Sequence, residues 1–242
     1  MSGLPDIRNN RMSYTKMKLG VLFSGGKDSV YATYRAMQKE EVSCLIALVS
    51  ENTESYMFHT PNIHLTSLQA EAMGIPILEY ITKGVEEEEL VDLKKAISLA
   101  VDQYGIEGIV TGAVLSVYQA TRIQKICDAL NLWCYNPLWH VDQDWYMQTL
   151  IDEGFVVIVS GVFSAPFDET WLGKRIDNEA LRLLRLYAVK YGITLTGEGG
   201  ELETLVTDAP FFKKKLVVLR SESVYANYNG RFSIQQAEVR EK

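Results

Sequence analysis

The chain has 242 residues, 47% of them hydrophobic, so it can bury a substantial core in one large domain or two small ones. Its 24 basic and 31 acidic residues give a net charge of -7, which disfavours broad contact with a nucleic-acid backbone. No run approaches the ~20 apolar residues that a membrane span needs, and residues 1–16 are polar rather than signal-like. We therefore expect a cytoplasmic protein whose partners are small molecules or proteins, with no membrane and no nucleic acid among them.

Residues 1–16 lack hydrophobic periodicity, and we expect a disordered leader there. An apolar run at 19–23 predicts a buried strand, and residues 30–37 predict a helix. The segment between them reads Ser24-Gly25-Gly26-Lys27-Asp28-Ser29. A strand, a glycine turn and a helix in this order form a phosphate site, because the glycines permit close backbone approach and the free N–H groups of the helix start face an anion.

The polar residues of this segment indicate the kind of phosphate ligand. Ser24 and Ser29 add hydroxyl donors, and Lys27 adds a positive charge. Asp28 would repel a phosphate unless it caps the helix or a divalent cation lies between them, so it points to Mg²⁺. The spacing matches neither a Walker loop nor a dinucleotide fingerprint. It resembles the PP-loop of the N-type ATP pyrophosphatases, which split ATP between the α- and β-phosphates and adenylate a substrate; an ordinary glycine turn is the alternative.

Strands and helices alternate from residue 18 to about residue 137. Further strands are expected at 42–50, 77–81 and 107–112, and helices at 62–73, at 90–104 and from about residue 116. This alternation predicts an α/β fold with a parallel, doubly wound sheet. We assign residues 17–137 to a PP-loop ATP-binding domain of this HUP-like architecture.

In such a sheet, ligands bind at the carboxyl edge of the strands. The second strand ends at Ser50 and is followed by a polar and aromatic loop, 51–61, which includes His59 and either forms an adenine wall or covers the sheet. The fourth strand ends at Gly112, and the next helix begins with a second polar group, Ser116, Tyr118, Gln119 and Arg122. Arg122 either pairs with an ATP phosphate or is an ordinary exposed arginine.

From residue 138 the pattern changes. A helix begins in the aromatic segment 139–146, a strand is expected at 155–161, and a helix at 178–191. Short strands follow at 215–219, 223–228 and 231–239, with Asn229-Gly230 as the turn of a terminal hairpin. Residues 138–242 are thus expected to form a smaller α+β domain that binds the substrate and packs directly on the first domain.

A second polar group lies within this domain, in Gly197-Glu198-Gly199-Gly200-Glu201-Leu202-Glu203-Thr204. Three carboxylates among three glycines suit a cation, a metal-bound water or a proton to be removed. A plain acidic surface turn is the alternative.

Several segments occur together and in order: the loop at Ser24, residues 50–60, the Ser116-x-Tyr118-Gln119-x-x-Arg122 group, Trp171-Leu172-Gly173, and the glutamate segment at 197–204. This set resembles the diphthine-ammonia ligase family over residues 18 to about 219. Leu202 departs from the aromatic that many members carry there. The resemblance implies a short, archaeal-type ligase that uses ATP and Mg²⁺ to amidate diphthine on translation elongation factor 2; a homodimer is left open.

The resemblance also implies roles for the residues. The PP-loop would hold ATP, with Lys27, an Mg²⁺ at Asp28, and Arg122 neutralising charge as an acyl-adenylate and pyrophosphate form. Glu198, Glu201 and Glu203 are the candidates for attracting ammonium and accepting its proton. The remaining substrate contacts are predicted at Trp171, Gly199, Gly200 and Thr204, with the trimethylammonium group held by an acidic wall or by the Trp171 ring.

Two other functions stay open. One is a PP-loop enzyme of tRNA thiolation, although the chain lacks the paired cysteines and basic surface that are usual there. The other is a non-catalytic ATP-binding regulatory module. The three cysteines also lie outside the site segments, so free ammonium is a better nitrogen donor than glutamine.

Overall fold

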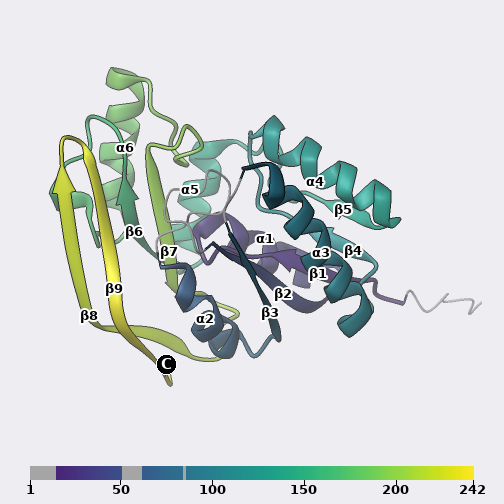
Figure 1. Ribbon diagram of the computed structural model, residues 1–242. Helices are drawn as coiled ribbons and strands as arrows, with labels where there is room; N and C mark the ends of the chain where they lie inside the picture. Colours follow the sequence, from purple (N-terminus) through teal and green to yellow (C-terminus); the bar gives the residue numbers. More distant parts are fainter. Residues whose placement is uncertain (1–14, 51–61, 84–85) are drawn as a thin grey trace, which may run out of the picture.

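The computed structural model describes residues 15–50, 62–83 and 86–242 (Figure 1). Most of the expected leader, and the loop proposed as an adenine wall with His59, lie outside the described residues. None of the helices in the described part of the chain is both long and apolar enough to cross a bilayer.

The first part of the chain forms a parallel five-stranded sheet in the order β3-β2-β1-β4-β5. Its strands are β1 (Lys18–Leu22), β2 (Glu41–Ser50), β3 (Ile77–Thr82), β4 (Gly108–Val110) and β5 (Trp133–Tyr135). Its helices are α1 (Lys27–Met37), α2 (Thr66–Met73), α3 (Glu86–Tyr104) and α4 (Val117–Leu130), and a 3-10 turn, η1 (Ile63–Leu65), precedes α2. The strand order reverses direction between β1 and β4, which is where ligands bind in doubly wound sheets.

Apolar residues on both faces of the strands explain why this sheet is covered on both sides. Ile46 and Ile109 pack beneath α3 and α4 in one buried cluster, whereas Leu19 and Val21 belong to a larger cluster around α1 and α2. Near-continuous apolar strands of this kind are typical of parallel sheets buried between helices.

The second part forms an antiparallel sheet in the order β7-β6-β9-β8. Its strands are β6 (Val156–Val162), β7 (Leu202–Asp208), β8 (Lys215–Ala226) and β9 (Asn229–Arg240), and its helices are α5 (Gln143–Asp152) and α6 (Asn178–Tyr191). The predicted fold class, a doubly wound α/β sheet followed by a smaller α+β part, is confirmed.

Some local predictions were wrong. The terminal hairpin turns at Asn227 and Tyr228, whose φ angles of 51° and 60° fit a two-residue turn, so Asn229 and Gly230 already belong to β9. The strands expected at 215–219 and 223–228 are one continuous strand, β8. Strands β5 and β7 were not predicted, and β7 places Leu202, Glu203 and Thr204 on a strand rather than in a turn.

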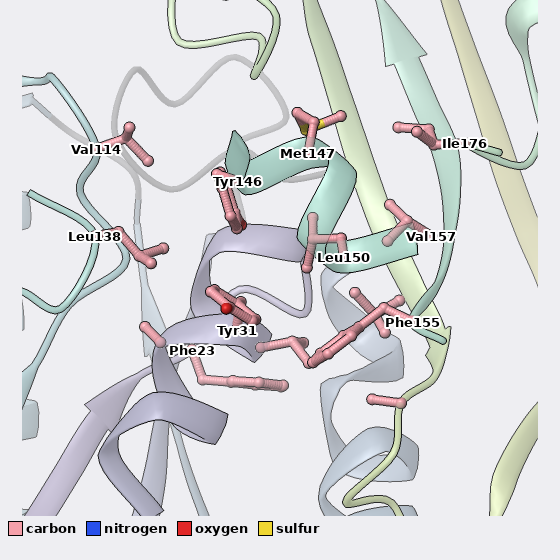
Figure 2. Close-up of a cluster of buried hydrophobic side chains, with 14 of the residues drawn as sticks. Phe23, Tyr31, Val114, Leu138, Tyr146, Met147, Leu150, Phe155, Val157 and Ile176 are labelled. Carbon is pink, nitrogen blue, oxygen red and sulfur yellow. The ribbon is translucent and has the colours of Figure 1, made fainter. Parts of the chain in front are cut away.

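The two parts share one hydrophobic core (Figure 2). Tyr31 of α1 lies between them, with its ring 5.2 Å from that of Tyr146 in α5 and 5.5 Å from that of Phe155. All three side chains are almost completely buried. The second part therefore packs directly against α1, the helix that begins at the glycine loop.

Candidate functional site

The glycine loop folds onto its own serines at the carboxyl end of β1. The backbone N–H of Ser24 donates to Ser29 Oγ at 3.3 Å, and the two hydroxyls lie 3.3 Å apart. Gly25 has a φ of +78°, a conformation that favours glycine. Ser24, Gly25, Gly26 and Ser29 thus form a compact turn at the start of α1, as the sequence predicted for a phosphate site.

The loop after β4 lies directly against this turn at Gly112. A Cβ atom at Gly112 would lie 2.8 Å from the Asp28 carbonyl carbon and 2.9 Å from the Ser29 nitrogen, closer than a side chain tolerates. Glycine is therefore required where the loops after β1 and β4 meet, and Gly112 reaches the site through its backbone.

Both parts of the chain form hydrogen bonds with the backbone of the glycine loop at Gly25. The Gly25 carbonyl accepts hydrogen bonds from the Val206 N–H at 3.0 Å and from Gln69 Nε2 at 2.9 Å. Gln69 is fully buried and also donates to the Val206 carbonyl at 2.7 Å. Gln69 was not predicted, because a single glutamine in a predicted helix carries no motif.

The two charged residues of the loop are tied to the second part as well. Lys27 Nζ lies 2.8 Å from Asp28 Oδ2 and donates a second hydrogen bond to the Thr196 carbonyl. The hydroxyl of Tyr146, which is fully buried, donates to Asp28 Oδ1 at 3.0 Å. Tyr146 was also missed, since only packing brings a residue 118 positions away to Asp28.

We expect Tyr146→Phe to lower the free energy of unfolding by about 1–3 kcal/mol, because a hydrogen bond to a charged group is lost. Burial and the Asp28 charge raise the pKa of the Tyr146 hydroxyl well above its usual value, so it remains a donor across the working pH range. Urea denaturation measures this effect. A variant with wild-type stability would show that this hydrogen bond does not contribute to the fold.

Two cavities meet at the loop. The first, of about 260 Å³, has an apolar wall that includes Ile46, Leu48, Ile63, Leu93 and Ile123. The second, of about 320 Å³, lies over Lys27 and the glutamate segment. Both are lined by Ser24, Asp28, Gln119 and Glu198. The apolar cavity and the polar cavity therefore share a boundary, which Ser24 and Asp28 of the glycine loop form together with Gln119 and Glu198.

The three predicted glutamates occupy different positions. Glu198 lines both cavities and accepts a hydrogen bond from the Leu115 N–H at 3.1 Å; burial and then the charge of Asp28 raise its pKa. Glu201 lines neither cavity and instead accepts from the N–H and hydroxyl of Thr194, at 2.8 and 2.9 Å. Glu201 therefore shapes the turn and does not face the cavities.

Glu203 lines the second cavity from β7. Its Oε2 atom is buried and has no hydrogen-bond partner in the described part of the chain. Burial raises the pKa of Glu203 to about 7, while the charge of Arg231 opposes this rise. A carboxylate with a pKa near 7 can both give and take a proton at neutral pH.

Glu203 should make the protein less stable as the pH rises. Its pKa is raised in the folded state, so its contribution to stability is fully present below its ordinary value of 4.5 and is lost as the pH rises through about 7. The loss should reach about 2–3 kcal/mol above pH 8. Urea denaturation at acidic and alkaline pH should show that Glu203→Gln lacks this part of the pH dependence. Identical pH dependence in both proteins would contradict the prediction.

Of the other predicted nucleotide contacts, some line a cavity and some do not. Ser116 lines the second cavity and caps α4 by accepting from the Gln119 N–H at 3.3 Å. The Arg122 guanidinium lies 3.3 Å above the centre of the Tyr118 ring, and neither side chain lines either cavity. Ser50 ends β2 but likewise contributes to neither cavity wall.

Of the four predicted substrate contacts, two line the second cavity and two do not. Gly200 and Thr204 line the second cavity, and Thr204 Oγ1 accepts from the Lys27 N–H at 3.1 Å. Gly199 instead packs against Glu201. Trp171 is 2% exposed and packs edge-on against Phe167, with ring centres 5.0 Å apart, so it presents no open face to a ligand in this structure.

Comparison with known families accounts for nearly the whole described chain. Residues 17–133 match the diphthamide synthase N-terminal domain, and residues 142–239 match the diphthamide synthase C-terminal domain. The chain belongs to the diphthamide synthase family. The glycine loop and first cavity lie mostly within the matched N-terminal domain, and the glutamate segment lies within the C-terminal domain.

Relatives named diphthine–ammonia ligase occur in several eukaryotes. The *Bos taurus* protein is 34% identical over 228 residues, which cover 86% of this chain and 85% of that protein. The *Schizosaccharomyces pombe* protein is 31% identical over 86% of this chain but only 37% of its own length. A solved structure described as a predicted subunit of tRNA methyltransferase from *Methanocaldococcus jannaschii* aligns with a TM-score of 0.41 and 19% identity, over 80% of this chain and 98% of that one, a likeness too distant to bear on function.

Proposed function

We propose that this member of the diphthamide synthase family catalyses the ATP-dependent amidation of diphthine on translation elongation factor 2. Ammonium supplies the nitrogen, and the products are diphthamide, AMP and pyrophosphate. The observation that carries the proposal is the junction of the two cavities at Ser24, Asp28, Gln119 and Glu198. This arrangement suits a reaction in which one substrate is first joined to a nucleotide and then released from it by a second nucleophile.

The apolar cavity suits the adenosine part of ATP, and the glycine loop suits its phosphates. Apolar walls with a few polar groups are typical of nucleotide sites. The start of α1, where a helix has N–H groups without helical partners that suit an anion, lies at the point where the loops after β1 and β4 meet; the Lys27 N–H is bonded to Thr204 Oγ1 there. Lys27 is held at this position by Asp28 and Thr196, so its charge is already placed near the phosphates before ATP binds.

Asp28 fits a role in holding Mg²⁺. Each of its oxygens accepts one hydrogen bond, from Lys27 and from Tyr146, which leaves further lone pairs on both. Mg²⁺ in such sites uses one or two carboxylates together with substrate phosphates and water, so a dedicated cluster of protein ligands is not needed. When bound, the ion would neutralise charge on the phosphates.

The first step joins the diphthine carboxylate to the nucleotide. A carboxylate oxygen attacks the α-phosphorus of ATP, the bond to the β-phosphate oxygen breaks, and pyrophosphate leaves as the acyl-adenylate forms. The Lys27 ammonium and the loop N–H groups stabilise the charge that develops on the phosphates. Gln119, which lines both cavities, lies where it can orient the reacting groups.

The second step forms the amide. The ammonia nitrogen attacks the acyl carbon, the bond to the AMP oxygen breaks, and the proton that the new amide nitrogen loses goes to water. Before the attack, ammonium must give up one proton to become this nucleophile. We assign this proton to Glu203, whose unpartnered oxygen lies in the second cavity wall. Glu198 lies in the same cavity, and its negative charge suits the trimethylammonium group of diphthine better than the buried Trp171 does.

Incubation with ATP, Mg²⁺, ammonium and elongation factor 2 carrying diphthine tests this function. We expect AMP release that depends on the factor, together with conversion of the diphthine carboxylate to an amide by mass spectrometry. Release of ADP instead of AMP would exclude adenylation. AMP release with tRNA but not with the factor would favour the thiolation reading, and ATP binding without turnover would favour a regulatory module.

A further inference from the structure

Three residues on neighbouring strands lie in one row of the second sheet. Gly161 of β6 is opposite Glu203 of β7 on one side and opposite Arg231 of β9 on the other. Residues directly opposite each other in antiparallel strands direct their side chains to the same face. Glu203 and Arg231 therefore share a face and are separated by a position that has no side chain.

The Phe163 ring fills the space above Gly161. Phe163 follows the end of β6, and its Cζ atom would lie 2.6 Å from a Cβ atom at Gly161. The Arg231 guanidinium carbon lies 5.9 Å from the centre of the Phe163 ring. The ring thus lies over the glycine between Glu203 and Arg231.

Glu203 and Arg231 are close enough to influence each other but do not pair. Among the described residues, they form neither a hydrogen bond nor an ion pair, and both Glu203 Oε2 and Arg231 Nε are buried without a hydrogen-bond partner. An arginine in contact with a buried carboxylate would normally form such a pair. Gly161 separates the two positions, and the Phe163 ring lies over Gly161.

We propose that Arg231 adjusts the proton affinity of Glu203 from across Gly161, and that the Phe163 ring keeps the two side chains from pairing. This inference rests on the proposed function, in which Glu203 accepts a proton from ammonium. A direct ion pair would hold Glu203 ionised and make it a poor proton acceptor, whereas burial without any positive charge would hold it protonated. A positive charge at an intermediate distance leaves Glu203 able both to accept and to release a proton.

The electrostatics around Glu203 agree with this geometry. Burial raises the pKa of Glu203, and the charge of Arg231 lowers it. Lys27, Asp28 and Glu198 line the same cavity, and Glu201 lies in the adjoining turn with its carboxylate bound to Thr194. Arg231 is a positively charged residue on the same face of the sheet as Glu203, across Gly161. Arg231 is thus a positioning residue that acts through charge, without touching substrate.

The test is a direct titration of Glu203 by carbon-13 NMR of the glutamate carboxyls in the full chain, with the signal assigned by its loss in Glu203→Gln. We expect Arg231→Met to raise the Glu203 midpoint by about one pH unit, and Arg231→Lys to leave it near the wild-type value. Arg182→Met removes an exposed arginine of α6 that pairs with Glu179, and serves as the control. An unchanged midpoint in Arg231→Met, or an equal shift in the control, overturns the proposal.

A second variant keeps the proposal testable if Arg231→Met does not fold. Phe163→Ala removes the ring, lets Arg231 approach Glu203, and should move the midpoint in the opposite direction, downward. A midpoint that stays or rises in this variant would contradict the role of the ring. The pH profile of amidation separates the effect of Arg231 on Glu203 from the role of Glu203 in catalysis. If the Glu203 midpoint shifts but the pH profile of amidation does not, Arg231 still acts on Glu203, but Glu203 is not the proton acceptor.

Discussion

Glu203→Gln is expected to reduce the rate of amidation by about 10²–10⁴-fold while leaving adenylation near the wild-type rate. The amide side chain has nearly the shape of the carboxylate, but it cannot accept the proton that ammonium must lose to become a nucleophile. Glu203 lines the second cavity and not the apolar one, so ATP binding and the first step should be retained. ATP–pyrophosphate exchange reports the first step, and mass spectrometry of the elongation factor reports the second.

Alkaline pH and a control variant make this prediction specific. The share of nitrogen present as free ammonia rises steeply with pH, so the defect of Glu203→Gln should shrink at high pH if proton acceptance is its cause. Glu179→Gln changes an exposed glutamate of α6 in the same way and should behave like wild type. If exchange and amidation fall together in Glu203→Gln, the residue acts in binding or folding and the assigned role is wrong.

Asp28→Asn is expected to reduce ATP–pyrophosphate exchange by at least about 10²-fold and to lower the free energy of unfolding, because the buried Lys27 ammonium loses its counter-charge. The asparagine oxygen can still accept from the Tyr146 hydroxyl, so the packing of α5 on the loop should be retained. What is lost is the negative charge that balances Lys27 and that we propose holds Mg²⁺. The Mg²⁺ concentration needed for half-maximal exchange should rise in the variant.

Asp144→Asn is the matched control for this substitution. Asp144 is an exposed residue of α5 that pairs with Arg185 at 2.7 Å, away from both cavities. It should retain wild-type exchange and the same Mg²⁺ dependence. Wild-type Mg²⁺ dependence in Asp28→Asn would show that this carboxylate does not hold the ion, even if the rate of exchange falls.

The fold class and the glycine loop could be predicted because their signals are local. The apolar run before Ser24, the two glycines after it and the helical spacing beyond all lie within a few residues of one another. The two missed strands have weaker signals: β5 has three residues, and β7 follows the glycine-rich glutamate segment, which reads as a turn. The hairpin turn was misplaced by two residues because Asn-Gly is a stronger turn signal than Asn-Tyr.

The candidate site could be predicted by segment but not by side chain. The sequence grouped Glu198, Glu201 and Glu203 without distinguishing them, and packing then directed Glu201 to Thr194 and left Glu203 in the cavity wall. Trp171 stood in a charged loop, and packing buried it against Phe167.

Local patterns therefore predicted which segments contribute to the candidate site. They also predicted at which edge of the sheet the loops meet, since the order of strands and helices dictates where parallel strands end. The partners of those residues depended on the assembled chain. Tyr146 reaches Asp28 across 118 positions, Thr204 reaches Lys27 across 177, and Arg231 faces Glu203 only because β7, β6 and β9 lie side by side. Contacts of this kind follow from how the two sheets pack around α1, and no sequence spacing encodes them.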